Sequence, residues 1–404
     1  MSDNLRVKKG FLLSISLIVF ITSFPSPSLA AIRPGATCPL AGIIKIVIGK
    51  KYTCIKSGKK LVWNKGIVIK KPFPTPSPSA EIIPNPSPTP TPTQSKIPSV
   101  SLPESWPLDK PADKNLFLIA DASIRKYISD ATKIPKINLM TGPNTDRSTA
   151  NYYLRFLEKA AIGWGKDWMP DQVDIAMAQV DDFDWIKPLW KQYGLDGGGF
   201  DNSELSWRQF GANCNQGGAI YDKVPFFWAC LPYYPSNFIG LNKFAPHEYT
   251  HLVQYGIIYH QSGKKIHNFP YLLSEGSADF YGLTYASTPE NLMQNWQTYW
   301  AEGYISPSAK SALKSASKEE IESLLVDAMK SGTKAPGHWY WTGAYLTARL
   351  VAAKGHEGFV AYMRKTGETG DPLMAFEKIY GIRFEILTRI VAPEIKDLTV
   401  NLRE

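Results

Sequence analysis

The chain has 404 residues, of which 44% are hydrophobic and 12% aromatic, and its formal net charge at pH 7 is +9. This composition excludes a wholly disordered protein and provides enough apolar material for one large globular domain with smaller appendages. The positive charge is concentrated near the N-terminus, because residues 31–71 contain Arg33, nine lysines and no carboxylate. The rest of the chain is slightly acidic, and we expect no nucleic-acid partner.

Residues 1–30 are predicted to form a signal peptide. A basic start precedes an apolar core at residues 10–24, which is short for a membrane span. Ser28 and Ala30 are small residues at the positions that a signal peptidase reads, so cleavage is expected before Ala31. The protein is therefore expected to be secreted or associated with the cell surface, and an uncleaved membrane anchor is the alternative.

The four cysteines fall into two local pairs, Cys38 with Cys54 and Cys214 with Cys230. In an oxidising compartment each pair is expected to form a disulfide. Each bond would close a loop of about 15 residues and stabilise the fold by ~3 kcal/mol in the chain-entropy model. Zinc binding by the four cysteines is the competing interpretation, but the chain has no Cys-x-x-Cys pair. We therefore predict two disulfides.

The composition divides the exported chain into three parts. Residues 31–71 are predicted to form a small basic Cys-pair module, with β-like runs at 43–48 and 61–63. Residues 72–107 are rich in Pro, Ser and Thr, which favour an extended polyproline II linker that cannot bury a core. Residues 108–404 are expected to form the large domain.

The large domain is predicted to be of the α+β class. Residues 116–120 and 173–180 are typical of strands, and residues 152–163 carry apolar side chains at helical spacing. Further helices are expected at 243–257, 271–286, 289–302, 318–330, 338–353, 357–365, 372–380 and 383–391. Strands followed by helices favour an N-terminal sheet packed on a largely helical C-terminal half.

The segment His247-Glu248-Tyr249-Thr250-His251 predicts a zinc site. Two histidines four residues apart share one face of a helix, so both imidazoles can bind one metal ion. Glu248 then lies beside the metal, where its carboxylate can act as a general base toward water. The competing interpretation is a histidine pair on the surface or at the cap of an ordinary helix.

Zinc requires a third protein ligand, and its position separates the enzyme classes. Gln254 and Ile257 stand where a metzincin would have Gly and His, so that class is excluded. Glu275 and Asp279 offer two carboxylates one helical turn apart. One of them can bind the metal while the other orients a ligand histidine.

These motifs resemble those of the gluzincins, which include thermolysin and the aminopeptidase N-like enzymes. The resemblance lies in the His-Glu-x-x-His segment and in Leu273-Ser274-Glu275-Gly276-Ser277-Ala278. It implies a zincin-like fold, one zinc ion per chain with Glu275 as its third ligand, and Asp279 as the hydrogen-bond partner of the first ligand histidine. Gly276-Ser277-Ala278-Asp279 is also similar to the aspzincin motif, whose third ligand is the Asp, but the Leu-x-Glu-Gly-x-Ala context favours Glu275. The spacing after His251 is longer than in the family, which implies an insertion around residues 262–267.

Tyr340-Trp341-Thr342-Gly343 resembles the Tyr-x-x-Gly helix of aminopeptidase N-like enzymes. The resemblance implies that Tyr340 donates a hydrogen bond to the developing oxyanion, with His338 as a second candidate donor. The alternative is that Tyr340 belongs to an aromatic core stripe together with Trp341 and Tyr345. The Gly-x-Met-Glu-Asn segment that holds the substrate's amino terminus in aminopeptidases is absent, which favours an endopeptidase.

The sequence therefore predicts a secreted zinc metallopeptidase that hydrolyses polypeptides. The alternative is a catalytically silent zincin-fold protein that binds the cell wall or another anionic surface, such as lipid headgroups, through its basic N-terminal module. That module resembles the Cys-pair modules of secreted actinobacterial proteins. For its lysines, simple solubility is the competing interpretation.

Overall fold

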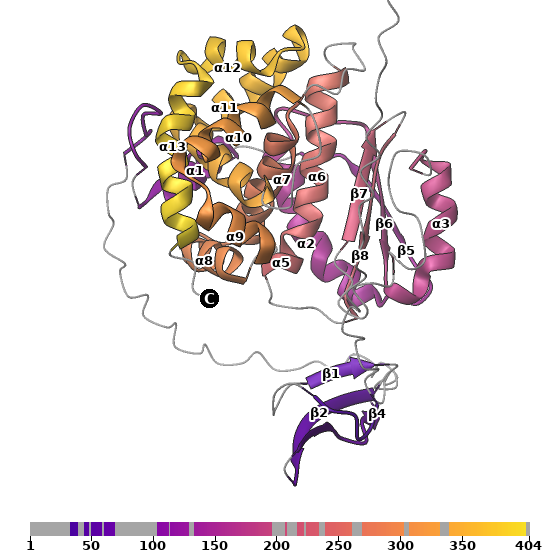
Figure 1. Cartoon of the computed structure of the whole chain (residues 1–404). Coiled ribbons are helices and arrows are strands. Elements are labelled where there is room, and N and C mark those ends of the chain that lie inside the picture. The colour runs from indigo at the N-terminus through magenta and orange to yellow at the C-terminus, as the bar shows by residue number, and fades with distance from the viewer. Residues whose placement is uncertain are drawn as a thin grey trace, which may run out of the picture. The chain divides into compact units, whose positions relative to one another are not determined.

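The computed structural model of the chain divides into two compact units, one within Met1–Pro88 and one within Thr89–Glu404 (Figure 1). It describes residues 33–38, 44–47, 50–58, 60–68, 103–112, 114–128, 133–195, 207, 216–221, 224–233, 239–260, 269–302, 307–331 and 339–400. The predicted signal peptide, most of the predicted linker and the predicted insertion at 262–267 lie outside these residues.

The small unit is built around an antiparallel sheet whose longest strand is β2 (Lys50–Ser57). Strand β2 pairs with β1 (Ile44–Val47), β3 (Lys60–Trp63) and β4 (Ile67–Val68). Strands β1 and β3 confirm the strands expected at 43–48 and 61–63. The turn between β2 and β3 places Gly58 at a φ of +60°, a conformation that favours glycine.

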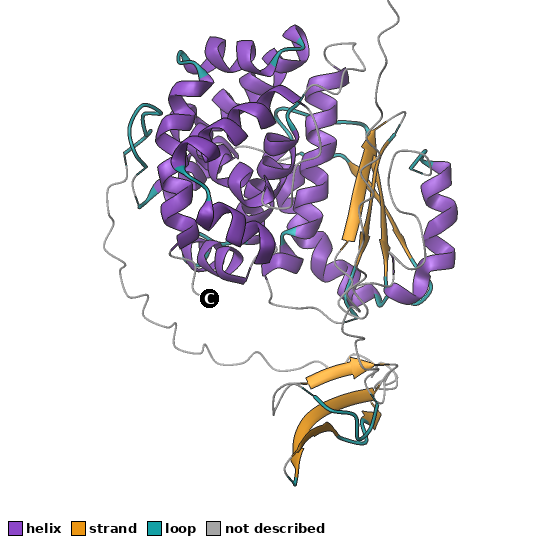
Figure 2. Cartoon of the chain, viewed as in Figure 1, coloured by secondary structure: helices purple, strands orange, loops and turns teal. Residues whose placement is uncertain are grey.

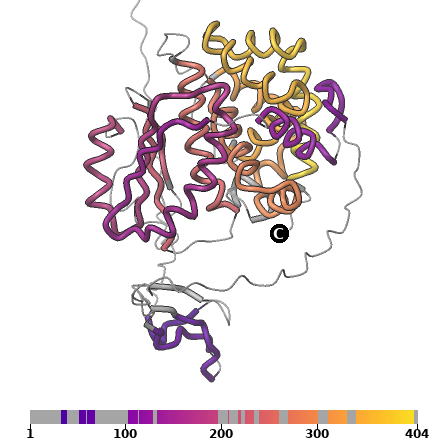
Figure 3. Tube along the Cα trace, turned by 180° about the vertical axis from the view of Figure 1, so that it is seen from behind, coloured from indigo at the N-terminus to yellow at the C-terminus, as the bar shows by residue number. Residues whose placement is uncertain are grey.

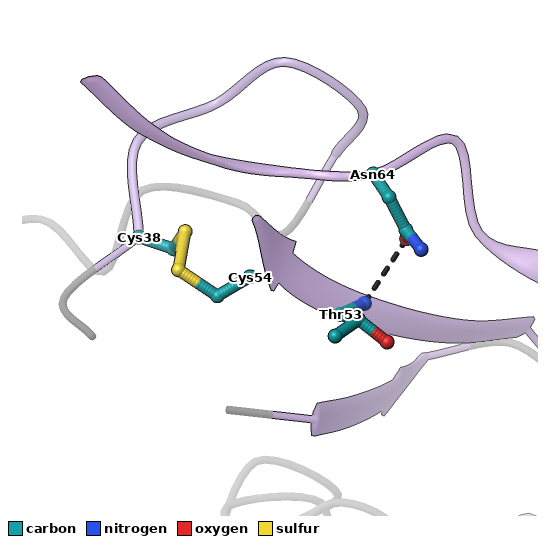
Figure 4. Close-up of a disulfide and its surroundings, with 4 residues drawn as sticks. All are labelled: Cys38, Thr53, Cys54 and Asn64. Carbon is teal, nitrogen blue, oxygen red and sulfur yellow. Dashed lines mark hydrogen bonds between the residues drawn. A yellow bond between two sulfur atoms is a disulfide. The ribbon is translucent and has the colours of Figure 1, made fainter. Parts of the chain in front are cut away.

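The predicted disulfide between Cys38 and Cys54 is present (Figure 4). It lies in a small apolar cluster with Tyr52 and Trp63. Beside it, the backbone N–H of Thr53 donates to Asn64 Oδ1 at 3.0 Å. A unit this small buries little apolar surface, so a covalent cross-link contributes a large share of its stability. Cys230 is also disulfide-bonded, and its predicted partner, Cys214, lies outside the described residues.

The large unit contains a mixed sheet in the order β5-β6-β8-β7 (Figure 2). Strands β5 (Lys136–Thr141), β6 (Gln172–Ala178) and β8 (Pro225–Cys230) are parallel, and β7 (Gln216–Tyr221) is antiparallel to β8 at the edge. The strand predicted at 173–180 is confirmed as β6.

Helices cover both faces of this sheet (Figures 1 and 3). Phe227 and Ala229 of β8 belong to the main core, whereas Phe226 and Trp228 belong to a second cluster on the other face. This alternation follows from the two-residue period of a strand. Helices α2 (Arg147–Trp164) and α6 (Phe244–Tyr255) contribute to the main core, and α3 (Phe183–Gln192) contributes to the second cluster.

The C-terminal part is almost entirely helical, as predicted, so the α+β class is confirmed at this level. After the short α5 (Ile239–Asn242) and α6, the helices are α7 (Tyr271–Ala286), α8 (Leu292–Glu302), α9 (Pro307–Ser315), α10 (Lys318–Ser331), α11 (Trp339–Thr369), α12 (Pro372–Tyr380) and α13 (Phe384–Val400). A π-helical turn, Gly256–His260, extends α6. None of the helices in the described ranges is both long and apolar enough to cross a membrane.

One expectation about this unit was wrong. Residues 116–120 were expected to form a strand but begin α1 (Leu116–Ile128), because Leu116, Ile119, Ala120 and Ile124 are buried at helical spacing and a short apolar run alone does not distinguish the two structures. The two helices expected at 338–353 and 357–365 are confirmed as the two parts of α11, which are separated by a non-helical residue, Gly355, with a φ of +71°.

Helices α7 and α11 cross at two glycines, and this crossing positions the candidate site. A Cβ atom added to Gly276 would lie 2.1 Å from the backbone of Gly343, and one added to Gly343 would lie 1.9 Å from the carbonyl oxygen of Leu272. Only glycine permits such a close approach of two backbones. Both glycines belong to the motifs singled out in the sequence, and their contact brings Tyr340 toward Glu275.

Candidate metal centre

Helices α6 and α7 bring His247, His251 and Glu275 together. The two histidine Nε2 atoms are 3.1 Å apart, and Glu275 Oε2 lies 3.4 Å from each of them. In the part of the chain that the structure describes, these residues form the one group of three His, Cys, Asp or Glu side chains that could hold a metal ion. The four-residue spacing of the histidines places both rings on the face of α6 that meets α7.

The separations within this group fit a tetrahedral zinc site. Zinc lies about 2.0–2.2 Å from nitrogen and oxygen ligands, which puts neighbouring ligand atoms of a tetrahedron about 3.3–3.5 Å apart. The observed separations of 3.1, 3.4 and 3.4 Å are close to these values. Two imidazole nitrogens and one carboxylate oxygen are also a donor set that suits zinc.

Asp279 lies behind this group. Its Oδ1 atom is 2.7 Å from Nδ1 of His247, on the side of the ring away from Glu275, and the residue is fully buried. A carboxylate only accepts hydrogen bonds, so His247 donates through Nδ1–H and its Nε2 lone pair faces the centre of the group. The structure therefore places Glu275 with the two Nε2 atoms and Asp279 against the opposite edge of one imidazole.

Two further residues that hold Asp279 were missed by the sequence analysis. The ammonium group of Lys243, at the start of α6, forms a buried ion pair with Asp279 Oδ1, and the hydroxyl of Tyr299, on α8, donates to Oδ2. Burial raises the pKa of Asp279, but Lys243 and His247 outweigh this effect, and the net shift is downward. Asp279 is therefore held as a carboxylate.

Among the described residues, the charges at the site do not balance. Glu248, Glu275 and Asp279 bring three negative charges and Lys243 brings one positive charge, so the cluster carries −2 when the carboxylates are ionised and the histidines are neutral. Burial lowers the pKa of His251, but the charges of Glu275 and Glu248 outweigh this effect and raise the pKa to about 9. A divalent cation or two protonated imidazoles would therefore neutralise the cluster.

Glu248 is also buried, at 5% exposure, on the same helix as the two histidines. Burial raises the pKa of its carboxyl, and the neighbouring His247 and His251 act in the opposite direction. Glu248 is thus a buried carboxyl group near the three candidate ligands but outside their group, where it could accept a proton.

Tyr340 lies at the site, whereas its aromatic neighbours belong to the core. Its ring stacks near that of His247, with 6.0 Å between centroids and 20° between planes. Trp341 and Tyr345 are buried in the main core. Of these three aromatic residues, Tyr340 therefore lies at the site, and Trp341 and Tyr345 belong to the core. The second candidate donor, His338, lies outside the described residues.

A second tyrosine at the site was not expected from the sequence. The hydroxyl of Tyr271, in the first turn of α7, lies 3.4 Å from that of Tyr340 and donates a hydrogen bond to Glu275. Burial, followed by the charge of Glu275, raises the pKa of Tyr271 to about 12. The centre is thus bordered by two neutral hydroxyl groups.

The edge strand β7 lies close to the site. A Cβ atom added to Gly217 would lie 2.6 Å from the ring of Phe244, which is parallel to the ring of His247 at 6.5 Å. One aromatic side chain therefore separates the edge of the sheet from a histidine of the candidate centre.

The chain matches no protein-family model, no curated protein and no solved structure.

Proposed function

We propose that the chain is a zinc-dependent endopeptidase whose zinc ion is held by His247, His251 and Glu275. The observation that carries the proposal is the convergence of their three ligand atoms within 3.4 Å. The charge of the cluster supports it, because a dication offsets the −2 left by three carboxylates and one lysine. The gluzincin-like motifs of the sequence favour the same ligand set.

The chain's own residues supply the other parts of a hydrolytic mechanism. Bound zinc would polarise the scissile carbonyl and lower the pKa of a water molecule. Glu248 takes a proton from the attacking water and returns it to the leaving amine. Tyr340 donates its O–H to the oxyanion as the carbonyl becomes tetrahedral, and the surrounding apolar core strengthens this hydrogen bond.

An extended polypeptide suits this site. Among the described strands, β7 pairs with β8 on one side and lies at the end of the strand order, so its other side would offer backbone groups to an added strand. Its contact with Phe244 keeps an added strand near His247. Backbone pairing along an edge does not require a free substrate terminus, which favours cleavage within a chain.

Export of the enzyme is part of the proposal. The Cys38–Cys54 disulfide is compatible with an oxidising compartment outside the cytosol. The basic Cys-pair module would then accompany the catalytic unit as a separate domain.

Metal analysis combined with a proteolysis assay tests the function. We expect one zinc ion per chain, hydrolysis of an unfolded protein substrate, and loss of hydrolysis when a chelator removes the metal. Glu248→Gln is the matched variant, because it keeps the shape of the side chain and leaves the ligands intact. It should retain zinc and lose about 10²–10⁴-fold in kcat. Wild-type protein that holds zinc without hydrolysing any polypeptide would instead support a silent zincin-fold binding protein.

A further inference from the structure

We infer that Gln254 is a positioning residue that fixes the ring of His251 for metal binding. The inference rests on the proposed zinc site and assigns a role to a residue outside the ligand set. Gln254 lies one turn after His251 on α6, and it is 3% exposed. Its Oε1 atom is 3.0 Å from Nδ1 of His251.

All four hydrogen-bonding positions of the Gln254 amide are occupied. Its Nε2 donates to the carbonyl oxygen of Ser274 and to Oγ of Ser277, both at 2.8 Å. Its Oε1 accepts from Oγ of Ser274 at 3.0 Å and faces Nδ1 of His251. A glutamine amide has two donor hydrogens and two acceptor lone pairs, so the group is fully satisfied.

This pattern determines which way the amide points. The Ser274 carbonyl oxygen can only accept, so the group that faces it must be the NH₂ of Gln254. The oxygen of Gln254 therefore faces His251, and the imidazole must carry its hydrogen on Nδ1. The Nε2 lone pair of His251 is then directed toward His247 and Glu275.

The same amide ties together the two helices that supply the ligands. Ser274 and Ser277 lie on α7 on either side of Glu275, and Gln254 bonds to both. Asp279 plays the corresponding part for His247, because it accepts from Nδ1 of that ring. Each histidine thus has its own acceptor, a carboxylate on α7 for one and a carboxamide on α6 for the other. Such partners change metal affinity because they fix both the tautomer and the ring orientation.

The test compares three variants of the full chain, each stripped of metal and titrated with zinc against a chromophoric chelator. Gln254→Met removes the acceptor with little change of shape, and we expect its zinc affinity to fall about 10–100-fold. Gln254→Glu keeps an acceptor for His251 but places an oxygen against the Ser274 carbonyl. It should lose stability to denaturant while its zinc affinity stays within about threefold of wild type. Ser277→Ala removes one bond to the Gln254 amide without touching His251, and it should behave in the same way as Gln254→Glu.

Nitrogen-15 and proton NMR of the zinc-loaded protein adds a readout that a purely structural role would not move. The Nδ1–H proton of His251 should be protected from exchange with water in wild type and lose that protection in Gln254→Met. Unchanged zinc affinity and unchanged protection in Gln254→Met would overturn the inference about Gln254 but leave the proposed function standing. Failure of the wild-type chain to bind zinc would overturn the proposed function and the inference with it.

Discussion

Two buried histidine clusters among the described residues of the large unit share helix α7, and they differ in the contacts that their ring nitrogens make. In the second cluster, His356 on α11 has Nε2 3.0 Å from Asp167 Oδ2 and Nδ1 2.9 Å from the hydroxyl of Tyr281. Both ring nitrogens are therefore used within the protein. In the candidate metal centre, each histidine uses Nδ1 within the protein and directs Nε2 toward Glu275.

The two clusters also differ in charge. Asp167 accepts from Tyr127 at 2.9 Å and lies 3.5 Å from the guanidinium of Arg364, so a single carboxylate faces a fixed cation and a histidine. Among the residues that the structure describes, the candidate metal centre combines three carboxylates with one fixed cation, Lys243. A buried His–Asp pair does not by itself indicate a metal site. Two Nε2 atoms that converge on a carboxylate, together with this excess of negative charge, favour a metal site.

The largest effect should come from exchanging one histidine of each cluster for leucine. His251→Leu removes a proposed zinc ligand, so we expect loss of zinc and a fall in kcat/KM of at least about 10³-fold. His356→Leu leaves Asp167 and Tyr281 without their buried partner, so it should destabilise the fold by about 1–3 kcal/mol while zinc content stays at one per chain. Zinc analysis and urea unfolding of both variants make the comparison. Loss of zinc in His356→Leu would erase the distinction between the clusters.

The next largest effect should come from the hydroxyl groups beside the candidate metal centre. Tyr340→Phe should lower kcat by about 10²-fold with little change in zinc affinity, because it removes an oxyanion donor that binds no metal. Tyr271→Phe should have a smaller effect on kcat, since its hydroxyl bonds to Glu275 and Tyr340. Steady-state kinetics with a quenched peptide substrate measure both. Equal activity of Tyr340→Phe and wild type would place Tyr340 with the aromatic core residues Trp341 and Tyr345.

The crossing of α7 and α11 can be perturbed by one methyl group. Gly343→Ala forces the Ala Cβ against the Leu272 carbonyl, so we expect a loss of about 1–3 kcal/mol in unfolding free energy. The displacement should move Tyr340 and lower kcat, while the His356–Tyr281 bond further along both helices remains. Thermal unfolding and kinetics test this, and an unchanged Tm would mean that the helices do not cross this closely.

The smallest effect is expected at the start of α2, at a residue outside the candidate metal centre. Asp146 caps this helix by accepting from the backbone N–H of Thr149 at 2.9 Å, and its pKa is lowered, first by the hydroxyl of Ser148 and then by that N–H. Asp146→Ala should cost about 1 kcal/mol with unchanged zinc affinity.

The pH dependence of this cap has a definite sign. The folded-state pKa of Asp146 lies below its ordinary value of 3.8, so the ionised cap stabilises the fold above that pH and loses its effect as the pH falls through the folded value. Asp146→Asn keeps an acceptor that does not titrate. Urea unfolding at pH 7 and pH 3 should show the advantage of wild type over Asp146→Asn shrinking at the lower pH. A constant difference would contradict the assignment.

Sequence patterns predicted most of the C-terminal helices, because a helix that packs against a core carries apolar residues at helical spacing whatever its neighbours are. Helix α7 has the predicted bounds, and α12 does too. Strand β8 was missed because Pro225–Cys230 is buried on both faces and therefore shows no polar alternation. Lys243 and Tyr299 were missed because nothing in their local sequence indicates the buried carboxylate that they bind, which lies on another helix.

The sequence by itself determined that His247 and His251 share one face of a helix with Glu248 beside them, because a four-residue spacing has this consequence in any α-helix. It also identified two carboxylates one turn apart on the next helix. Which of the two carboxylates lies beside the Nε2 atoms of both histidines was decided by the tertiary structure alone. The rotation and depth of α7 against α6 depend on packing across the whole core, including the contact of Gly276 with Gly343. That packing directs Glu275 toward both Nε2 atoms and Asp279 toward Lys243.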